Sequence, residues 1–377
     1  MSLGLKAAGF EHIALIEWNK DACRTLRKNG FSNIYEQDVR RFDFASLHGK
    51  VDLLAAGVPC QPFSLGGKHA GHRDERNLFS EVIRAIKECQ PKAVLIENVR
   101  GLIRPKFLPY FEYVLMHVAQ PDLKPRSNET WREHRARLAN ELRSNPTAGL
   151  RYVIGYRLIN CADYGVPQCR YRVFVVALRT DLNAEWEWPS LTHSRQALEA
   201  AKASGDYWLE HAIPPGGCGR KYLRPSSIAR WRTVRDALKG LPDPRSTDAL
   251  RIPNHVFVPG ARRYPGHSGS TLDEPAKTLK AGDHGNPGGE NTLVEDDGTI
   301  RYLTVREAAR LQAIPDNYEI IGTRSECMRQ VGNAVPVLVA KALGNAIVRA
   351  VRSSCRRNIA MPELRRRLIF TEQLSLA

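Results

Sequence analysis

The chain has 377 residues and a formal net charge of +16, with 56 Lys and Arg against 40 Asp and Glu. Its hydrophobic share of 42% is typical of a globular protein of about two domains and excludes a disordered one. No apolar run approaches the ~18 residues of a membrane span, and the basic excess favours a polyanionic partner such as nucleic acid.

The first 180 residues alternate between short apolar runs and amphipathic segments, which is typical of βαβ units. Strands are predicted at 12–16, 51–56, 93–96, 152–159 and 172–178, the last two as an antiparallel pair. Helices are predicted at 19–29, 77–87 and 107–119. The polar stretch 121–150 is predicted to be a surface insertion containing one exposed helix.

The composition changes after residue 180, where segments rich in Gly, Pro and aromatic residues replace the alternation. Such segments form loops whose shape depends on residues that can adopt positive φ. A strand followed by an amphipathic helix is predicted over 301–318, and another helix over 335–348. The arginine-rich stretch 349–367 is predicted to be solvated.

One of the eight cysteines has unusual surroundings. Cys60 follows the apolar run 51–56 and lies between Pro59 and Pro62, which restrict the backbone of its loop. A rigid mount suits a reactive thiol, because covalent catalysis requires that geometry be held. Taken alone, Cys60 is better explained as a buried and inert thiol, and only the neighbouring motifs reverse that preference. The sequence has no Cys-x-x-Cys pair, so we expect no metal site, and scattered thiols are typical of a cytoplasmic protein.

Five short motifs follow one another along the chain. They are Pro59-Cys60-Gln61-Pro62-Phe63-Ser64, Glu97-Asn98-Val99, Gln168-Cys169-Arg170-Tyr171-Arg172, Arg306-Glu307-Ala308-Ala309-Arg310-Leu311-Gln312, and Gln330-Val331-Gly332-Asn333-Ala334-Val335-Pro336. In residues and in order, they resemble the motifs of the DNA cytosine-5 methyltransferases of bacterial restriction–modification systems. Each motif alone is a weak signal, whereas five in the family's order are a specific one.

This resemblance implies an α/β fold. It consists of a Rossmann-like sheet of an S-adenosylmethionine-dependent methyltransferase, with helices on both faces, and a smaller loop-rich target-recognition domain. The implied domain bounds are 1–180 for the catalytic and cofactor domain, 181–320 for target recognition, 321–350 for a return to the catalytic domain, and 351–377 for a basic tail.

The resemblance also implies covalent catalysis on a cytosine flipped out of double-stranded DNA. The Cys60 thiolate would add to carbon 6 of the ring, which makes carbon 5 able to accept a methyl group. Protonated Glu97 would donate to ring nitrogen 3, and Arg170 and Arg172 would hold the base and the loop in register. Without Cys60 upstream, Glu97 would be better explained as a helix N-cap or an exposed strand-end carboxylate, and the two arginines as the solvent-facing side of a strand. Other substrate contacts are implied at Pro59, Gln61, Ser64, Asn98, Gln168, Arg262, Arg263 and Lys280.

The cofactor, S-adenosylmethionine, is expected at the carboxyl ends of the strands. Glu17 suits the ribose hydroxyls, Trp18 the adenine face and Asp38 the adenine amine. The rest of the pocket would come from Asn77, Leu78, Asn333 and Val335. The family's opening strand and Phe-x-Gly-x-Gly loop have no counterpart in this sequence. We therefore expect the natural chain to start roughly 15 residues earlier, about one strand and a loop.

Two other functions stay open on the sequence alone. One is a cytosine-5 methyltransferase that acts on transfer RNA with the same residues, and the other is an inactive DNA-binding remnant without the cofactor loop. The long region 181–300 favours DNA, because it is large enough for sequence readout. The resemblance further implies a monomer, with a cognate restriction endonuclease as its functional partner.

Overall fold

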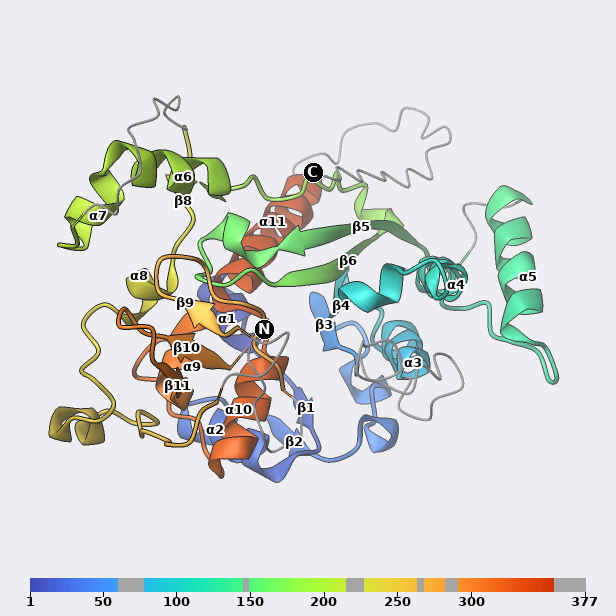
Figure 1. Cartoon of the computed structure of the whole chain (residues 1–377). Helices are drawn as coiled ribbons and strands as arrows, with labels where there is room; N and C mark the ends of the chain where they lie inside the picture. Colours follow the sequence, from blue (N-terminus) through green and yellow to red (C-terminus); the bar gives the residue numbers. More distant parts are fainter. Residues whose placement is uncertain (60–77, 145–148, 215–226, 263–267, 282–290, 356–377) are drawn as a thin grey trace. The chain divides into compact units, whose positions relative to one another are not determined.

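The computed structural model describes residues 1–59, 78–144, 149–214, 227–262, 268–281 and 291–355 (Figure 1). The chain divides into two compact units, and each unit draws on distant parts of the sequence. Unit 1 comprises Met1–Gln37, Asn160–Arg170 and Pro189–Asn345. Unit 2 comprises Asp38–Ile159, Tyr171–Trp188 and the part from Ala346 onward. The domain bounds given above remain a prediction.

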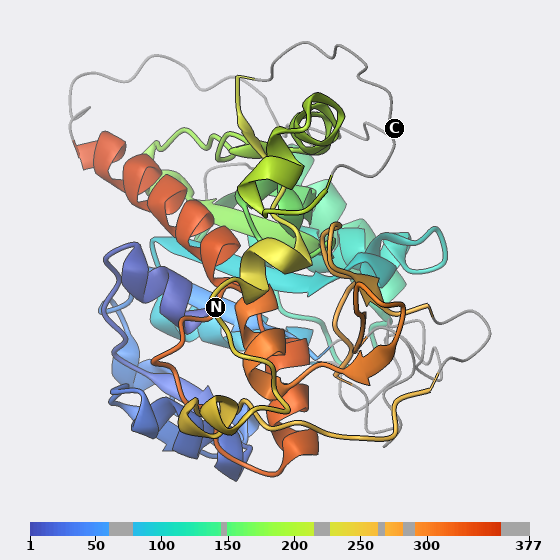
Figure 2. The ribbon, with the colours of Figure 1, turned by 60° about the vertical axis from the view of Figure 1, so that its left-hand side comes forward.

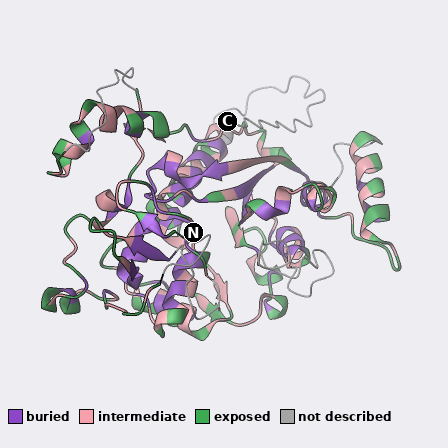
Figure 3. Ribbon diagram, in the orientation of Figure 1, coloured by how far each residue is buried: buried purple, intermediate pink, exposed green. Residues whose placement is uncertain are grey.

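Unit 2 is built on a four-stranded sheet in the order β3-β4-β6-β5. β3 (Leu53–Gly57) pairs in parallel with β4 (Ala93–Val99), which pairs antiparallel with β6 (Tyr171–Arg179). β5 (Tyr152–Asn160) forms the other edge. The interiors of β4 and β6 are buried, as Figure 3 shows, and their sequences are accordingly almost continuous apolar runs.

Helices α3 (Phe79–Cys89) and α4 (Leu108–Ala119) share one hydrophobic core with this sheet. Every second residue of β4 and β6 faces this core, as the alternation of a strand requires. The core residues of α3, α4, β4 and β6 are Phe79, Val82, Ile83, Ile86, Val94, Ile96, Phe111, Val114, Leu115, Val118, Val173, Val175 and Ala177. Helix α5 (Trp131–Ser144) packs on α4 through aromatic contacts such as Tyr110–Trp131, and its outer face is exposed.

Unit 1 contains short strands and many helices. β1 (Leu15–Glu17) and β2 (Ile34–Glu36) form a parallel pair. A three-stranded sheet has the order β11-β10-β9 and consists of Ile300–Tyr302, Thr292–Val294 and Ser270–Thr271, while β7 (His193–Ser194) pairs with β8 (Ala229–Arg230). The helices are α1 (Ser2–Ala7), α2 (Lys20–Lys28), α6 (Arg195–Ser204), α7 (Asp206–Glu210), α8 (Val234–Leu238), α9 (Val305–Leu311), α10 (Arg324–Asn333) and α11 (Val337–Cys355). Figure 2 shows α11 as a long helix near the end of the chain, and its residues from Ala346 onward are assigned to unit 2.

Two buried arginines organise the region around α9. Arg301 forms a bidentate ion pair with Glu307, at 2.7 and 2.6 Å, and Glu307 completes the capping box with Thr304 that begins α9. Arg306 is fully buried. Its guanidinium donates to the carbonyl oxygens of Pro253, Pro315 and Tyr318.

By length and composition, Arg324–Ser353 is the one described stretch apolar enough to cross a membrane, although half of its most apolar window is buried. The stretch is interrupted between α10 and α11. Val339, Leu343 and Ile347 of α11 are at most 1% exposed. We therefore interpret α11 as a core helix.

Most of the elements predicted before residue 180 and after residue 300 are confirmed, with shifts of a few residues. β4 continues three residues beyond the predicted strand and includes Glu97. Between 181 and 300, where the sequence predicts mainly loops, the chain forms α6, α7 and α8. Local capping explains α6 and α8: Ser194 and Thr233 accept from backbone N–H groups at their starts.

We predict that Gly4→Ala lowers the free energy of unfolding by about 1–3 kcal/mol, through overpacking. An added Cβ would lie 2.5 Å from Ala340 Cβ and in closer conflict still with the Val337 carbonyl oxygen at the start of α11. This clash outweighs the ~1 kcal/mol that alanine gains over glycine in a helix. Urea unfolding measures the effect. Gly57→Ala is the control, because no described atom lies within 4 Å of its added carbon; equal destabilisation by both variants would contradict the prediction.

Candidate active site

The carboxylate predicted to bind the target base lies near the end of β4. In the antiparallel register Val99 is opposite Arg172, so Arg172 is the diagonal neighbour of Glu97. Arg172 Nε lies 2.9 Å from Glu97 Oε1, and the two side chains are only 13% and 10% exposed. Because the two side chains form a buried ion pair, Glu97 is not a helix N-cap and Arg172 does not lie on a solvent-facing strand edge. The ion pair fixes the carboxylate at the tip of the sheet.

Asn98 links this tip to the segment that leads to Cys60. Its side chain is buried, and Asn98 Nδ2 donates to the Val58 carbonyl oxygen at 3.3 Å. Asn98 Oδ1 accepts from the backbone N–H of Val99 at 2.9 Å. The ends of β3 and β4 are therefore joined by a side chain as well as by their ladder. Predicted residues outside the described part of the chain are Cys60, Gln61, Ser64, Asn77 and Arg263.

Gln168 and Arg170 belong to unit 1, and both are fully buried. Arg170 Nη2 donates to the carbonyl oxygen of Gly332 at 2.6 Å, and Nη1 donates to that of Leu279 at 3.2 Å. Gln168 accepts from the backbone N–H of Leu279 and donates to the carbonyl oxygen of Leu311. These bonds join three of the predicted motifs and the segment before Lys280.

The two arginines that the sequence groups together are thus separated by the fold. Arg172 faces the carboxylate of Glu97, whereas Arg170 faces backbone carbonyl oxygens in the other unit. The contacts of Arg170 agree with the predicted role of this side chain in holding a loop in register. Contact of Arg170 with the base stays a prediction.

Three residues predicted to bind the cofactor are described around the first two strands. Glu17 ends β1 and accepts from the backbone N–H of Asn19 at 2.8 Å. Trp18 is 75% exposed, so its indole face is open for stacking. Asp38 caps the short 3₁₀ helix η1 (Val39–Arg41) by accepting from Arg40 N–H at 2.9 Å. Glu17, an acid at the end of a strand, has the chemistry to bind ribose hydroxyls, and the exposed indole of Trp18 has the chemistry to stack on adenine.

The remaining predicted pocket residues lie at helix ends. Leu78 is the N-cap of α3 and is half-buried. Asn333 ends α10 and is exposed, whereas Val335 is buried beside it. The Val335 carbonyl oxygen accepts from the amino group of Met1 at 3.4 Å.

Two described basic residues were predicted to contact DNA, and both Arg262 and Lys280 are exposed. The backbone of Lys280 is fixed on both sides by the side-chain amide of Asn291, at 3.1 and 3.0 Å. Pro59 ends the described segment before Cys60 and is half-buried. Their contacts with substrate stay predictions.

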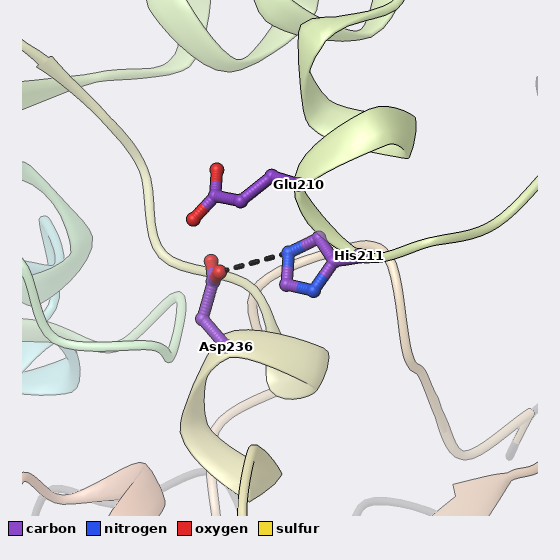
Figure 4. A group of neighbouring side chains, drawn as sticks. All are labelled: Glu210, His211 and Asp236. Carbon is purple, nitrogen blue, oxygen red and sulfur yellow. Dashed lines mark ion pairs between the residues drawn. The ribbon is translucent and has the colours of Figure 1, made fainter.

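The structure also gathers a set of residues that the sequence did not indicate. Glu210, His211 and Asp236 place one ligand atom each within 4.8 Å of one another (Figure 4). Arg230 already bridges the two carboxylates, at 2.6 and 2.8 Å from Asp236 and 2.8 Å from Glu210. Asp236 additionally accepts from Thr233 N–H at 2.7 Å. The guanidinium supplies the charge that a metal would, so we interpret the cluster as an ion-pair network.

The same network extends through α7 and α8. Arg235 pairs with Asp273 at 2.7 Å and with Asp296 at 2.6 Å. Tyr207, fully buried on α7, bonds to Asp273 at 2.8 Å and to Thr233 at 2.9 Å. Burial is the main cause that raises the pKa of Tyr207 well above the usual range for tyrosine, and the hydrogen bond to Asp273 also raises it. Polar contacts therefore hold much of this loop-rich region together.

Comparison with known proteins identifies the family. The sequence model of the family of C-5 cytosine-specific DNA methylases matches residues 1–121 and 132–349, so the chain belongs to that family. The Type II methyltransferase M.NgoMIV of Neisseria gonorrhoeae is 33% identical over 355 residues, covering 93% of this chain and 94% of that protein. M.Eco47II of Escherichia coli is 33% identical over 354 residues, covering 92% and 76%.

Solved structures show the same fold at low identity. The S. pombe Dnmt2 methyltransferase matches with a TM-score of 0.58 and 16% identity, covering 93% of this chain and 95% of that one. The Entamoeba histolytica methyltransferase EhMeth matches with a TM-score of 0.55 and 14% identity, covering 92% and 94%. The family and the α/β methyltransferase fold class predicted from the motifs are confirmed.

We predict that Arg170→Met lowers the free energy of unfolding by about 3 kcal/mol, because it leaves buried carbonyl oxygens without donors. Arg329→Met is the control: Arg329 is on α10 in the same unit, and its partly exposed side chain pairs with Glu326. Such pairs contribute at most about 1 kcal/mol. Chemical unfolding measures both variants, and equal stability of the two would contradict the bracing role of Arg170.

A second prediction concerns Asp236 and pH. Burial raises the pKa of Asp236, but hydrogen bonds from Arg230 and Thr233 N–H outweigh burial and bring it to about 2, below its ordinary 3.8. Because the folded pKa is the lower one, this stabilisation is present above pH ~4 and is lost as the pH falls toward 2. We expect Asp236→Asn to flatten the fall in Tm across that range, whereas Asp248→Asn does not. We also expect EDTA to leave Tm unchanged; a drop would contradict the ion-pair interpretation.

Proposed function

We propose that this protein is a DNA (cytosine-5-)-methyltransferase, which transfers the methyl group of S-adenosylmethionine to carbon 5 of cytosine within a specific double-stranded sequence. The observation that carries this proposal is the buried Glu97–Arg172 pair at the tip of β4, in a chain of the C-5 cytosine-specific family. A carboxylate held by an arginine at a strand end is suited to grip one edge of a flipped base.

The residues divide the chemistry between them. The Cys60 thiolate adds to carbon 6 of the flipped cytosine, and Glu97, in its protonated form, gives its proton to ring nitrogen 3, so that carbon 5 becomes the nucleophilic carbon of an enamine. Arg172 keeps Glu97 in place during this step. When bound, S-adenosylmethionine supplies an electrophilic methyl group. After transfer, solvent water takes the carbon 5 proton, ring nitrogen 3 returns its proton to Glu97, and the Cys60 sulfur departs as the thiolate, which restores the ring.

Glu17, Trp18 and Asp38 would hold the ribose, the adenine face and the adenine amine of the cofactor. Leu78, Asn77, Asn333 and Val335 would complete that pocket. Gln168 and Arg170 brace the segment that presents Lys280, which we assign with Arg262 and Arg263 to DNA contact.

We further propose that the protein acts as a monomer in the bacterial cytoplasm and protects DNA from a cognate restriction endonuclease. The support is its likeness to relatives named Type II methyltransferases, several of which are at least 30% identical. The same likeness does not favour transfer RNA as the substrate. The following test distinguishes an active enzyme from the alternative of an inactive DNA-binding remnant.

We predict that the protein forms a covalent adduct with duplex DNA containing 5-fluorocytosine, in the presence of S-adenosylmethionine. Fluorine on carbon 5 cannot leave as a proton, so the sulfur stays attached after methyl transfer. Denaturing gels measure the adduct, which Cys60→Ala should abolish and Cys89→Ala, in α3, should not. Bisulfite sequencing of DNA from expressing cells then identifies the modified cytosine. Absence of any adduct on DNA bearing every cytosine context would reject the enzyme.

A further inference from the structure

One side chain of α3 holds the segment that begins with Asp38. Arg84 Nη2 donates to the Val39 carbonyl oxygen at 2.8 Å, and Nη1 donates to that of Phe42 at 3.0 Å. The guanidinium carbon also lies 4.8 Å from the centre of the Phe44 ring. All of these residues belong to unit 2. Arg84 Nη2 also donates to the Arg40 carbonyl oxygen at 3.4 Å, so the arginine contacts residues 39 to 44 at four points.

The guanidinium is itself held on α3. Arg84 pairs with Glu81 at 2.8 Å and with Glu88 at 3.2 Å, one turn before and one turn after it. The side chain is 29% exposed. A planar fork with five donors can satisfy two carboxylates and two carbonyl oxygens together, which a lysine ammonium cannot do in fixed geometry. The residue type therefore matters, as well as its charge.

The far end of the segment is fixed to the same helix. Cys89 Sγ donates to the Phe44 carbonyl oxygen at 3.5 Å, and the backbone N–H of Gly49 donates to the Cys89 carbonyl oxygen at 3.1 Å. Phe44 is 3% exposed. Nearer to Asp38, Arg84 joins the segment to α3 through hydrogen bonds to the carbonyl oxygens of Val39, Arg40 and Phe42. Its removal would release the start of the segment and leave the end anchored.

We propose that Arg84 is a positioning residue for the adenine end of S-adenosylmethionine. It fixes Asp38 relative to α3, the helix to which Arg84 belongs. Leu78 is the N-cap of α3, so this helix sets the positions of both residues that would line the adenine pocket. This inference rests on the proposed function, in which Asp38 takes the adenine amine and Leu78 lines the pocket. If the Asp38 carboxylate loses its fixed position, it must be ordered when the cofactor binds, and the cost of this ordering lowers the affinity for the cofactor.

The test is calorimetric binding of S-adenosylhomocysteine and steady-state methyl transfer by Arg84→Met and Arg84→Lys. We expect the Kd for S-adenosylhomocysteine and the KM for S-adenosylmethionine to rise about tenfold in Arg84→Met, the equivalent of roughly one lost charged hydrogen bond. Arg84→Lys keeps the charge over Phe44 and should lie in between. The kcat at saturating cofactor and the KM for DNA should stay within about twofold of wild type.

Arg135→Met is the matched control, because Arg135 makes a single described ion pair, with Glu112 of α4, in the same unit. It should leave every constant unchanged. Equal rises in the KM values for cofactor and DNA would show general loosening and overturn the inference, as would unchanged cofactor affinity in folded Arg84 variants. Failure of the wild type to bind S-adenosylhomocysteine would instead reject the proposed function, and this inference with it.

Discussion

The antiparallel register of β4 against β6 is the constraint on which the rest of the site depends. It places Arg172 diagonally across from Glu97, and the interiors of both strands are buried, so a slip by one residue would turn Arg172 to the other face. An isolated buried carboxylate would be costly, and the arginine offsets that cost. The hydrophobic strands therefore determine where a charged pair lies, and that pair presents the group that would grip cytosine.

Arginine has a second use throughout the molecule. Arg84, Arg170 and Arg306 donate to backbone carbonyl oxygens of loops and helix ends, and Arg230 and Arg235 join acidic side chains into a network. A planar fork can satisfy several loop carbonyls at once, which suits chain segments that have few ladder bonds of their own. The positive charges of the fully buried Arg170 and Arg306 are therefore structural and are not available to DNA phosphates.

The sequence predicted the elements near the motifs well, because apolar runs such as 93–96 and 172–178 report burial directly. It did not separate Arg170 from Arg172, since spacing alone cannot show that the fold turns between them. The partners of Arg170 lie 109 and 162 residues away and are backbone carbonyls, which carry no residue signature. The missed helices α6 and α8 had visible caps in Ser194 and Thr233, but their short apolar patterns were hidden among Gly and Pro. The role of Arg84 depends on loop carbonyls and had no sequence signal.

The most direct test of this account is a double-mutant cycle on single-turnover methyl transfer to duplex DNA. Glu97→Gln and Arg172→Met should each slow the transfer by about 100-fold, the size expected for loss of one positioned acid. The double variant should be no slower than the worse single variant, because the two side chains act as one unit. Losses that multiply in the double variant would show that Glu97 and Arg172 act independently and would contradict the account.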